Sequence, residues 1–506
     1  MSGVEAMAQQ SEKKETRYVG VKENLAYGLA NAGQVFGYNL FAGSFLSMFF
    51  VKVFGIPSQA VATMILVLGI WDTINDPIMG GIIDRTRSRY GKLRPYLLIV
   101  PIPLSIATIL FWSGPALLQD VQNMTIKIVY MYISYILWEF FYTLGDVPFW
   151  GMSTAISPSP SDRTRAISTA RFLSGLIGGL SSSLLLPVLM DLSENNKIGW
   201  SLKQVFAFMG ILAAVFILGL FSLAGFFTKE RVVQTVQEES IFQGFKYLFK
   251  NKPLMLIVAG NVIGTISSVA SIFGSYYYNE VLNLMSLNII VSLCGSIGGY
   301  LAYIILPIIK RKLDNRQIVF FTAISKAVIG TLCFFIGFNH YDKWYIAIPI
   351  LSVQNIVLMF VGTINQIVPT EMIGDTVDYM EWKTGVRNEG ISFSVLTFVN
   401  KLTSSLSTSI ATALLPAIGY IVINQQNADG TVETITQCTS AGGQPTQFWL
   451  WAFFTIIPNI AGLLSVIPYF FYDLKGAKLE NIRSEMKIRR EALAKEASAG
   501  GVSDEQ

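Results

Sequence analysis

Long apolar segments follow one another along nearly the whole chain, each separated from the next by a short polar stretch. A run of about 20 largely apolar residues is long enough to cross a bilayer as a helix. The pattern predicts twelve such spans, at residues 25–53, 58–83, 96–114, 126–152, 171–190, 204–227, 254–279, 283–309, 318–338, 345–368, 390–423 and 447–472. We therefore expect an all-α polytopic membrane protein.

A polar stretch at residues 228–253 divides these spans into six and six. The expected parts are a cytoplasmic N-terminus (1–24), an N-terminal bundle (25–227), a middle loop (228–253), a C-terminal bundle (254–472) and a cytoplasmic tail (473–506). Each half places a basic turn between its second and third spans. This six-plus-six layout is that of major facilitator transporters, whose substrate sites lie near the midplane between the halves.

Lysine and arginine positions predict the orientation. Of 37 such residues, the outer loops and span ends hold only Lys52, Lys127, Lys197, Lys203 and Lys343. An excess of positive charge on one side marks the cytoplasmic side, so both termini are expected there. The first 24 residues lack the apolar core and cleavage site of a signal peptide, and the first span should therefore remain as an anchor. We expect a multi-pass protein of the cell membrane.

Composition supports the membrane class and narrows the chemistry. Hydrophobic residues make up 52% of the 506 residues, charged residues 14%, and mean hydropathy is +0.50. Soluble proteins have about 25% charged residues. Three scattered cysteines and a single histidine offer no disulfide framework, no histidine-based catalytic triad and no transition-metal site. The sequence predicts neither an enzyme nor a cofactor.

Two carboxylates interrupt the second span. Asp72 and Asp76 are four residues apart, so a helix places them on one face, where they repel each other. An aspartate at bilayer depth costs about 2.5 to 3.5 kcal/mol, and such residues usually face a cavity or an ion pathway. Pro77 cannot donate to the carbonyl of Thr73, which adds an oxygen ligand. The pair predicts a cation site; the alternative is a protonated or hydrogen-bonded pair that joins two helices.

The first span carries a polar stripe. Its members, at spacings of three and four that keep them on one helical face, are Asn24, Tyr27, Asn31, Gln34 and Tyr38. This face is expected to line a wet cavity. The alternative is hydrogen bonding between packed helices, which is worth about 0.6 kcal/mol per bond.

The fourth span has a second such face, formed by Glu139, Thr143, Asp146 and Trp150. An indole beside acids suits a sugar, because the C–H face of the ring packs on the aromatic while its hydroxyls bind charged acceptors. Trp150 also lies near the inner end of the span, where tryptophan serves as an interfacial anchor. Both interpretations of Trp150 stay open.

Three cations fall inside spans. Arg171 opens the fifth span and Lys401 interrupts the eleventh, and each is able to pair with an intramembrane acid. A purely structural ion pair is the alternative for both. Lys326, in the ninth span, has no evident partner in the sequence pattern.

At these residues the chain resembles the glycoside, pentoside and hexuronide cation symporters of the major facilitator superfamily, over about residues 20 to 475. The matching motifs are Trp71-Asp72-Thr73-Ile74-Asn75-Asp76-Pro77 with Asp84-Arg85-Thr86-Arg87-Ser88-Arg89-Tyr90-Gly91-Lys92, Tyr142-Thr143-Leu144-Gly145-Asp146-Val147-Pro148-Phe149-Trp150, and Gly374-Asp375-Thr376-Val377-Asp378-Tyr379 with Glu381-Trp382-Lys383 and Arg387-Asn388-Glu389-Gly390. These motifs are spread over both halves of the chain and follow the order that they have in the family.

The resemblance implies roles for individual residues. It implies a sodium or proton site at Asp72, Asp76 and Thr143, with Asp146 shared between cation and sugar. The resemblance places sugar contacts at Asp146, Trp150, Arg171, Thr397 and Lys401, to which we add the first-span residues Asn31, Gln34 and Tyr38. Members that carry melibiose have a Lys-Asp pair where this chain has Gln34 and Val35, so one sugar-binding carboxylate is missing. Glu139 is an additional acid that would alter ion choice.

Together these features predict a secondary active transporter that brings a sugar into the cell with Na⁺ or H⁺ by alternating access, acting as a monomer in the bilayer without nucleic acid. Two alternatives share the fold: a carrier of a lipid or other non-sugar solute, and an uncoupled sugar facilitator. An intramembrane aspartyl protease usually needs a Gly-x-Gly-Asp element. Here Thr143-Leu144-Gly145-Asp146 lacks the first glycine, and twelve spans are too many.

Overall fold

The structure is a computed structural model, which describes residues 17–41, 44–232, 251–384, 389–426, 432–476, 478–482, 484–486 and 488. It forms two compact units. The first comprises Met1–Ile56, Trp71–Val236 and Asn424–Thr434, and the second comprises Pro57–Ile70, Gln237–Ile423 and Ile435–Gln506. The domain boundaries given above stay a prediction.

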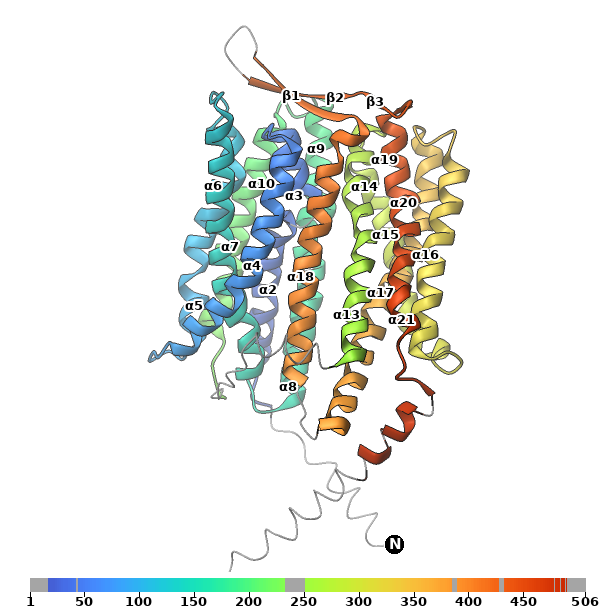
Figure 1. Cartoon of the computed structure of the whole chain (residues 1–506). Coiled ribbons are helices and arrows are strands. Elements are labelled where there is room, and N and C mark those ends of the chain that lie inside the picture. The colour runs from blue at the N-terminus through green and yellow to red at the C-terminus, as the bar shows by residue number, and fades with distance from the viewer. Residues whose placement is uncertain are drawn as a thin grey trace, which may run out of the picture. The chain divides into compact units, whose positions relative to one another are not determined.

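Helices make up the described part of the N-terminal half (Figure 1). They are α2 (Val21–Phe41), α3 (Ser44–Met48), η1 (Phe49–Val53), α4 (Ser58–Arg85), α5 (Arg94–Ile99), α6 (Pro101–Leu117), α7 (Met124–Ala155), α8 (Pro160–Leu173), η2 (Ser174–Gly178), η3 (Ser181–Leu185), α9 (Leu186–Glu194), α10 (Leu202–Phe216), η4 (Ile217–Phe221) and α11 (Ser222–Phe227). Of these, η1, η2, η3 and η4 are π-helical turns.

The C-terminal half adds two short hairpins to its helices. Its elements are α13 (Lys252–Gly264), η5 (Thr265–Ser268), α14 (Val269–Glu280), α15 (Leu287–Ile309), α16 (Asn315–Gly337), α17 (Trp344–Thr384), α18 (Glu389–Leu414), η6 (Pro416–Ile418), β1 (Tyr420–Gln426), β2 (Val432–Cys438), β3 (Ser440–Ala441), β4 (Gln444–Pro445), α19 (Thr446–Thr455), α20 (Ile457–Ala461), η7 (Gly462–Val466) and α21 (Ile467–Phe470). Strand β1 pairs with β2, and β3 is antiparallel to β4.

Nine helical segments within the described ranges are long and apolar enough to cross a membrane, or ten if the bent pair Val21–Phe41 and Phe45–Val53 is one span. Of the other two predicted spans, α6 is a shorter apolar helix, and α18 includes residues whose side chains lie outside the described set. The protein is a multi-pass membrane protein. The number twelve and the cytoplasmic termini stay predictions.

Three helical boundaries differ from the predicted spans. The fifth span begins at Pro160, α17 continues beyond the apolar segment to Thr384, and α18 ends at Leu414. The residues from Asp375 to Lys383, expected in a loop, are therefore helical. Hydropathy marks only the part of a helix that lies in lipid, whereas polar residues continue the same helix into water. After α18, β1 opens with Tyr420 and three consecutive β-branched residues, Ile421, Val422 and Ile423, and such residues favour strands.

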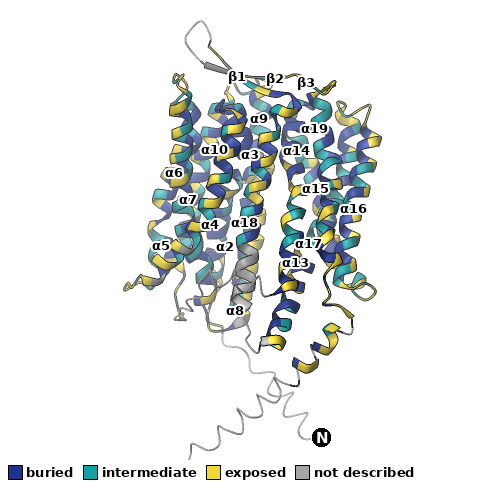
Figure 2. Ribbon diagram, in the orientation of Figure 1, coloured by how far each residue is buried: buried dark blue, intermediate teal, exposed yellow. Residues whose placement is uncertain are grey.

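Apolar packing differs between the inside of each unit and its outer surface. In the first unit, Phe41 stacks on Trp138 with ring centroids 3.5 Å apart and also contacts Phe111 and Trp112. On α15, exposed apolar residues recur every three or four positions (Figure 2), namely Ile290, Leu293, Ile297, Leu301, Ile304 and Ile308. Such a stripe is the face that a membrane helix turns to lipid.

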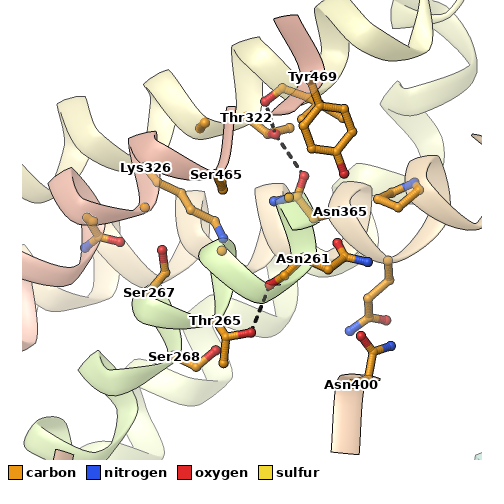
Figure 3. A pocket seen from close by; sticks show the side chains of 18 of the residues that line it. Asn261, Thr265, Ser267, Ser268, Thr322, Lys326, Asn365, Asn400, Ser465 and Tyr469 are labelled. Atoms are coloured by element: carbon orange, nitrogen blue, oxygen red, sulfur yellow. Dashed lines mark hydrogen bonds between the residues drawn. The ribbon is translucent and has the colours of Figure 1, made fainter. Parts of the chain in front are cut away.

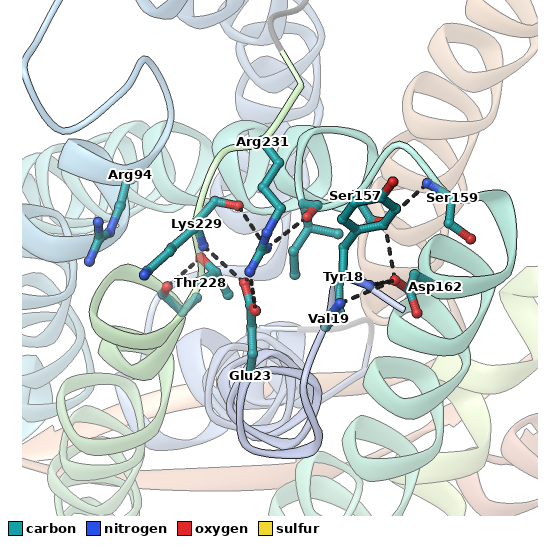
Figure 4. A network of polar contacts seen from close by, with 12 residues as sticks. Tyr18, Val19, Glu23, Arg94, Ser157, Ser159, Asp162, Thr228, Lys229 and Arg231 are labelled. Atoms are coloured by element: carbon teal, nitrogen blue, oxygen red, sulfur yellow. Dashed lines mark hydrogen bonds and ion pairs between the residues drawn. The ribbon is translucent and has the colours of Figure 1, made fainter. Parts of the chain in front are cut away.

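Charged residues tie the two chain ends of the first unit together (Figure 4). The Arg231 guanidinium donates to both Glu23 oxygens, at 2.8 Å each, and this pair raises the pKa of Arg231. Arg231 also donates to the Ile156 carbonyl at 2.8 Å. One turn away, the Asp162 carboxylate accepts from the backbone N–H groups of Tyr18 and Val19. The start of α2 is thus held against residues that follow α7 and α11.

Glu230 organises the basic turn between the second and third spans. Its carboxylate accepts from the backbone N–H groups of Lys92, Leu93 and Arg94, at 2.9, 2.8 and 2.9 Å. These groups lie at the N-terminus of α5, where a negative charge is favourable. Gly91, at φ +107°, gives the carboxylate room, because a Cβ there would come within 2.3 Å of Glu230 Oε1.

We expect Glu230→Gln to destabilise the protein by about 2 kcal/mol, because the amide keeps one acceptor oxygen. The two bonds at Oε1 then go to a neutral group and the bond from Lys92 N–H to Oε2 is lost. In a thermal unfolding assay this corresponds to a lower Tm by about 4–8 °C. Asp342→Asn, which removes the same charge from an exposed loop position, is the control. An unchanged Tm for Glu230→Gln would show that the turn does not depend on the carboxylate charge.

Candidate functional site

A direct hydrogen bond joins the polar faces of the first and fourth spans. Gln34 in α2 donates through Nε2 to Oδ1 of Asp146 in α7, at 2.6 Å. Gln34 is 2% exposed, and its own carbonyl oxygen, Oε1, has no partner among the described residues. Its amide fixes one oxygen of Asp146, whose carboxylate is half-buried.

Three acids gather around two tyrosines of α7. The phenol of Tyr142 lies within electrostatic range of Asp146, Glu139 and Asp72, and that of Tyr135 within range of Glu139 and Asp72. Asp72 of α4 and the acids of α7 therefore act electrostatically on the same two phenols. Several carboxylates in one low-dielectric region repel one another unless a cation or a proton neutralises them.

The remaining predicted cation ligands lie on the same two helices. Asp76 follows Asp72 by one turn of the continuous helix α4 and is likewise half-buried. Thr143 is 2% exposed and Glu139 is 6% exposed. A hydroxyl, carboxylates and water are the oxygen ligands that hard cations take. The described residues contain no group of three or more histidine, cysteine, aspartate or glutamate residues arranged for a metal ion.

An aromatic and cationic surface lies next to Asp146. The Arg171 guanidinium lies over the Trp150 ring, 4.4 Å from its centroid. Tyr27 is within electrostatic range of both Asp146 and Arg171, and it stacks on Phe149 with centroids 4.4 Å apart. Trp150 is half-buried and Arg171 is exposed. Indole, guanidinium and carboxylate are thus presented together by α7 and α8.

The polar stripe of α2 serves two purposes. Asn24 donates to Thr169 Oγ1 at 2.8 Å, Tyr27 to the Phe149 carbonyl at 2.9 Å and Asn31 to the Ala170 carbonyl at 3.1 Å. These three bonds fix α2 against α7 and α8, which is the helix-packing interpretation of the stripe. Gln34 instead reaches Asp146.

Tyr38, at the end of the stripe, is 43% exposed and stacks on Tyr142 with ring centroids 5.1 Å apart. Lys401 and Thr397 belong to α18, in the second unit. Lys401 is half-buried, and the side chain of Thr397 lies outside the described residues.

Two residues of this region were not among the site residues predicted from the sequence. Tyr142 precedes Asp146 by one helical turn but reads as an ordinary apolar position. Asn75 is fully buried, and neither polar atom of its side chain has a partner among the described residues. Its signal was present, since an asparagine between two aspartates in an apolar span is as costly to bury as any other polar group.

Comparisons with known proteins identify the family of the chain. The model of the MFS/sugar transport protein family matches residues 26–476. The glucuronide carrier protein homolog of Escherichia coli (strain K12) is 27% identical over 472 residues, which are 92% of this chain and 95% of the relative. The isoprimeverose transporter of Lactiplantibacillus pentosus is 28% identical over 421 residues, 80% and 82% of the two chains.

A solved structure supports the fold alone. The crystal structure of the nucleoside transporter NupG aligns with a TM-score of 0.56 at 12% identity, over 89% of this chain and 98% of that one. The family model covers most of the chain and confirms the resemblance seen in the motifs. The chain therefore belongs to the MFS/sugar transport protein family, whose members are membrane transporters and not enzymes.

Proposed function

We propose that this transporter carries a sugar, of the glycoside, pentoside or hexuronide class, into the cell by symport with Na⁺ or H⁺. The observation that carries the proposal is the bond from Gln34 Nε2 to Asp146 Oδ1, at 2.6 Å, together with the Arg171 guanidinium 4.4 Å from the Trp150 ring centroid. Asp72 and Glu139 lie within electrostatic range of Tyr142, as Asp146 does. The acids of this region suit a cation, and the indole and guanidinium beside them suit a sugar.

For the cation, Asp72, Asp76, Thr143 and Asp146 supply the ligands. Their charge density favours occupation by a positive ion, since the carboxylates otherwise repel one another. The hydroxyl of Thr143 favours Na⁺, whereas buried Glu139 offers a group that takes up a proton. The coupling ion is thus proposed to be one of these two.

For the sugar, Trp150 supplies the flat apolar surface and Arg171 donates to hydroxyls. The Asp146 carboxylate accepts hydrogen bonds from sugar hydroxyls, and Gln34 holds that carboxylate in place. We also assign Asn31 and Tyr38 to the sugar site. Sugar contacts of Thr397 and Lys401, which belong to the second unit, stay a prediction from the resemblance. The Asn31 side chain donates to the Ala170 carbonyl of α8, and its Oδ1 has no partner among the described residues.

Asp146 connects the two ligands. A bound cation lowers the repulsion that Asp146 feels and orders its carboxylate for sugar hydroxyls. Coupling of this kind is reciprocal, so each ligand raises the affinity of the other by the same factor. Alternating access then releases both on the inner side.

Uptake by proteoliposomes tests the proposal, with a panel of labelled glycosides, pentosides and hexuronides measured with a Na⁺ gradient, with a proton gradient and with neither. We expect accumulation of at least one sugar that a single ion gradient drives and that a sodium ionophore or a protonophore abolishes. Equilibration without accumulation would instead indicate an uncoupled facilitator. No sugar uptake under any gradient would contradict the proposal and favour another solute.

Trp150→Ala is expected to raise the KM for sugar uptake about two- to tenfold, because stacking on an indole contributes about 0.5–1.5 kcal/mol. Trp150→Phe should retain part of this contact and raise KM less. The interfacial-anchor interpretation predicts the reverse, namely lower expression or thermostability at unchanged KM. Measuring KM together with the amount of folded protein separates the two.

A further inference from the structure

A polar cavity lies within the second unit, built from residues that the proposed sugar and cation sites do not use (Figure 3). It has a volume of about 350 Å³, and its walls come from α13, η5, α16, α17, α18, α20, η7 and α21. Hydroxyl and amide side chains dominate the lining, among them Asn261, Thr265, Ser267, Thr322, Asn365 and Asn459. An apolar bundle core would not need such a surface.

Lys326 is the charged residue of this cavity. It stands eleven residues from each end of α16 (Asn315–Gly337), at about 16 Å from either end for a rise of 1.5 Å per residue. A lysine side chain is too short to reach water over that distance along the helix. Figure 3 shows the side chain extending into the cavity toward the α13 and η5 segment.

The amine has no opposite charge in the described structure. No described residue that lines the cavity is an aspartate or a glutamate, and Lys326 forms no ion pair within the described ranges. A lysine at bilayer depth costs about 2.5–3.5 kcal/mol, and such residues usually pair with an acid or mark a ligand pathway. No acid lies among the described lining residues, and a ligand with a negative charge would complement the amine.

Neutral groups around the amine are prepared for a ligand with hydroxyls. The Thr322 hydroxyl lies 2.8 Å from both the Val319 carbonyl oxygen and Asn365 Oδ1, which holds the Asn365 amide at the cavity wall. The Asn261 side chain makes no hydrogen bond to another described residue, and its amide lines the cavity near Thr265. Donors and acceptors are thus both available within the same space.

Cavity size distinguishes the classes of anion. A water molecule takes about 30 Å³ of liquid, and a halide ion is of similar size, so about 350 Å³ far exceeds what a single inorganic ion fills. Binding sites for small organic molecules start at about 300 Å³. We propose that this cavity binds a small polyhydroxylated carboxylate, with the Lys326 amine paired to the carboxylate and the amide and hydroxyl groups bound to the ligand hydroxyls.

The matched probes are D-glucuronate and D-glucose, which differ only in the carboxylate at C6. Binding to the purified protein in nanodiscs is measured by calorimetry, with acetate as a third ligand. We expect glucuronate to bind at least tenfold more tightly than glucose, and Lys326→Gln to remove this difference. Lys343→Gln removes the same charge from an exposed position and should leave it unchanged.

Several results would overturn the proposal. Equal affinities for glucuronate and glucose in the wild type would do so, as would a preference that survives in Lys326→Gln. Acetate bound as tightly as glucuronate would overturn the polyol part of it. If Lys326→Gln fails to fold, Asn261→Ala serves instead. It should weaken glucuronate at least threefold and leave acetate unchanged, and equal effects on both would contradict the assigned contacts.

Uptake measurements separate two sources of the carboxylate. Accumulation of labelled glucuronate that Lys326→Gln abolishes, with uptake of a neutral glycoside intact, identifies the ligand as a transported solute. Binding without uptake identifies a ligand that stays on the protein. Both support the cavity as a carboxylate site. Because the binding assay needs no sugar transport, its failure is distinguishable from failure of the proposed symport.

Discussion

Asp146→Asn is expected to raise the Kd or KM for sugar about 100-fold. The substitution keeps the size of the side chain but replaces a charged acceptor by a neutral amide. Hydrogen bonds to a charged group contribute about 1.5–3 kcal/mol each, so two weakened sugar hydroxyl bonds cost about 3 kcal/mol. The bond from Gln34 Nε2 persists if the new amide turns its oxygen toward it. Binding of a transported glycoside to protein in nanodiscs measures the effect.

Asp120→Asn is the matched control, since it removes one negative charge from an exposed turn of the same unit. It should bind sugar as the wild type does. Thermal unfolding of both variants reports whether the fold is intact. A near wild-type affinity in folded Asp146→Asn would remove Asp146 from the sugar site.

Asp76→Asn is expected to abolish accumulation while allowing sugar to equilibrate. One elementary charge moving through 100 mV supplies about 2.3 kcal/mol, which corresponds to about 50-fold accumulation of a coupled solute. Without the second carboxylate of α4 the cation is bound too weakly for its gradient to be used. The ratio of inside to outside sugar should then fall from about 50 to about 1, as measured in proteoliposomes with a set potential.

Asp72→Asn should behave in the same way, because Asp72 is the α4 acid within range of Tyr142 and Tyr135. Glu139→Gln distinguishes the ion. Loss of proton-driven uptake in Glu139→Gln would identify Glu139 as the proton acceptor. Retained Na⁺-driven uptake in Glu139→Gln would assign the cation to Asp72 and Asp76. Full gradient-driven accumulation in both α4 variants would contradict the proposed cation site.

Much of the fold was predictable because lipid imposes a simple constraint on sequence. Every span needs about 20 apolar residues, so the apolar segments locate the helices. The length of an apolar segment does not predict how far a helix continues outside the lipid. It therefore ended the tenth span at residue 368, although α17 continues to Thr384, and began the fifth at residue 171, although α8 starts at Pro160.

The candidate site was predictable only along single helices. Residue spacing places Glu139, Thr143 and Asp146 on one face of α7, but it does not predict which helix packs against that face. The bond from Gln34 to Asp146 depends on how α2 packs against α7, and the proximity of Asp72 depends on α4. For the same reason Lys326 had no interpretation, since its cavity is assembled from helices that are distant in sequence.

The ion pair between Glu23 and Arg231 makes the first unit a closed loop. The two residues are 208 positions apart, and the same guanidinium also holds the carbonyl of Ile156. Backbone N–H groups of Arg231 and Val232 both donate to the Ala155 carbonyl, at 2.8 and 3.0 Å. A chain cut after Val232 would keep all of these bonds on one fragment. The N-terminal fragment of such a cut chain would therefore still have the start of α2 joined to the residues that follow α7 and α11.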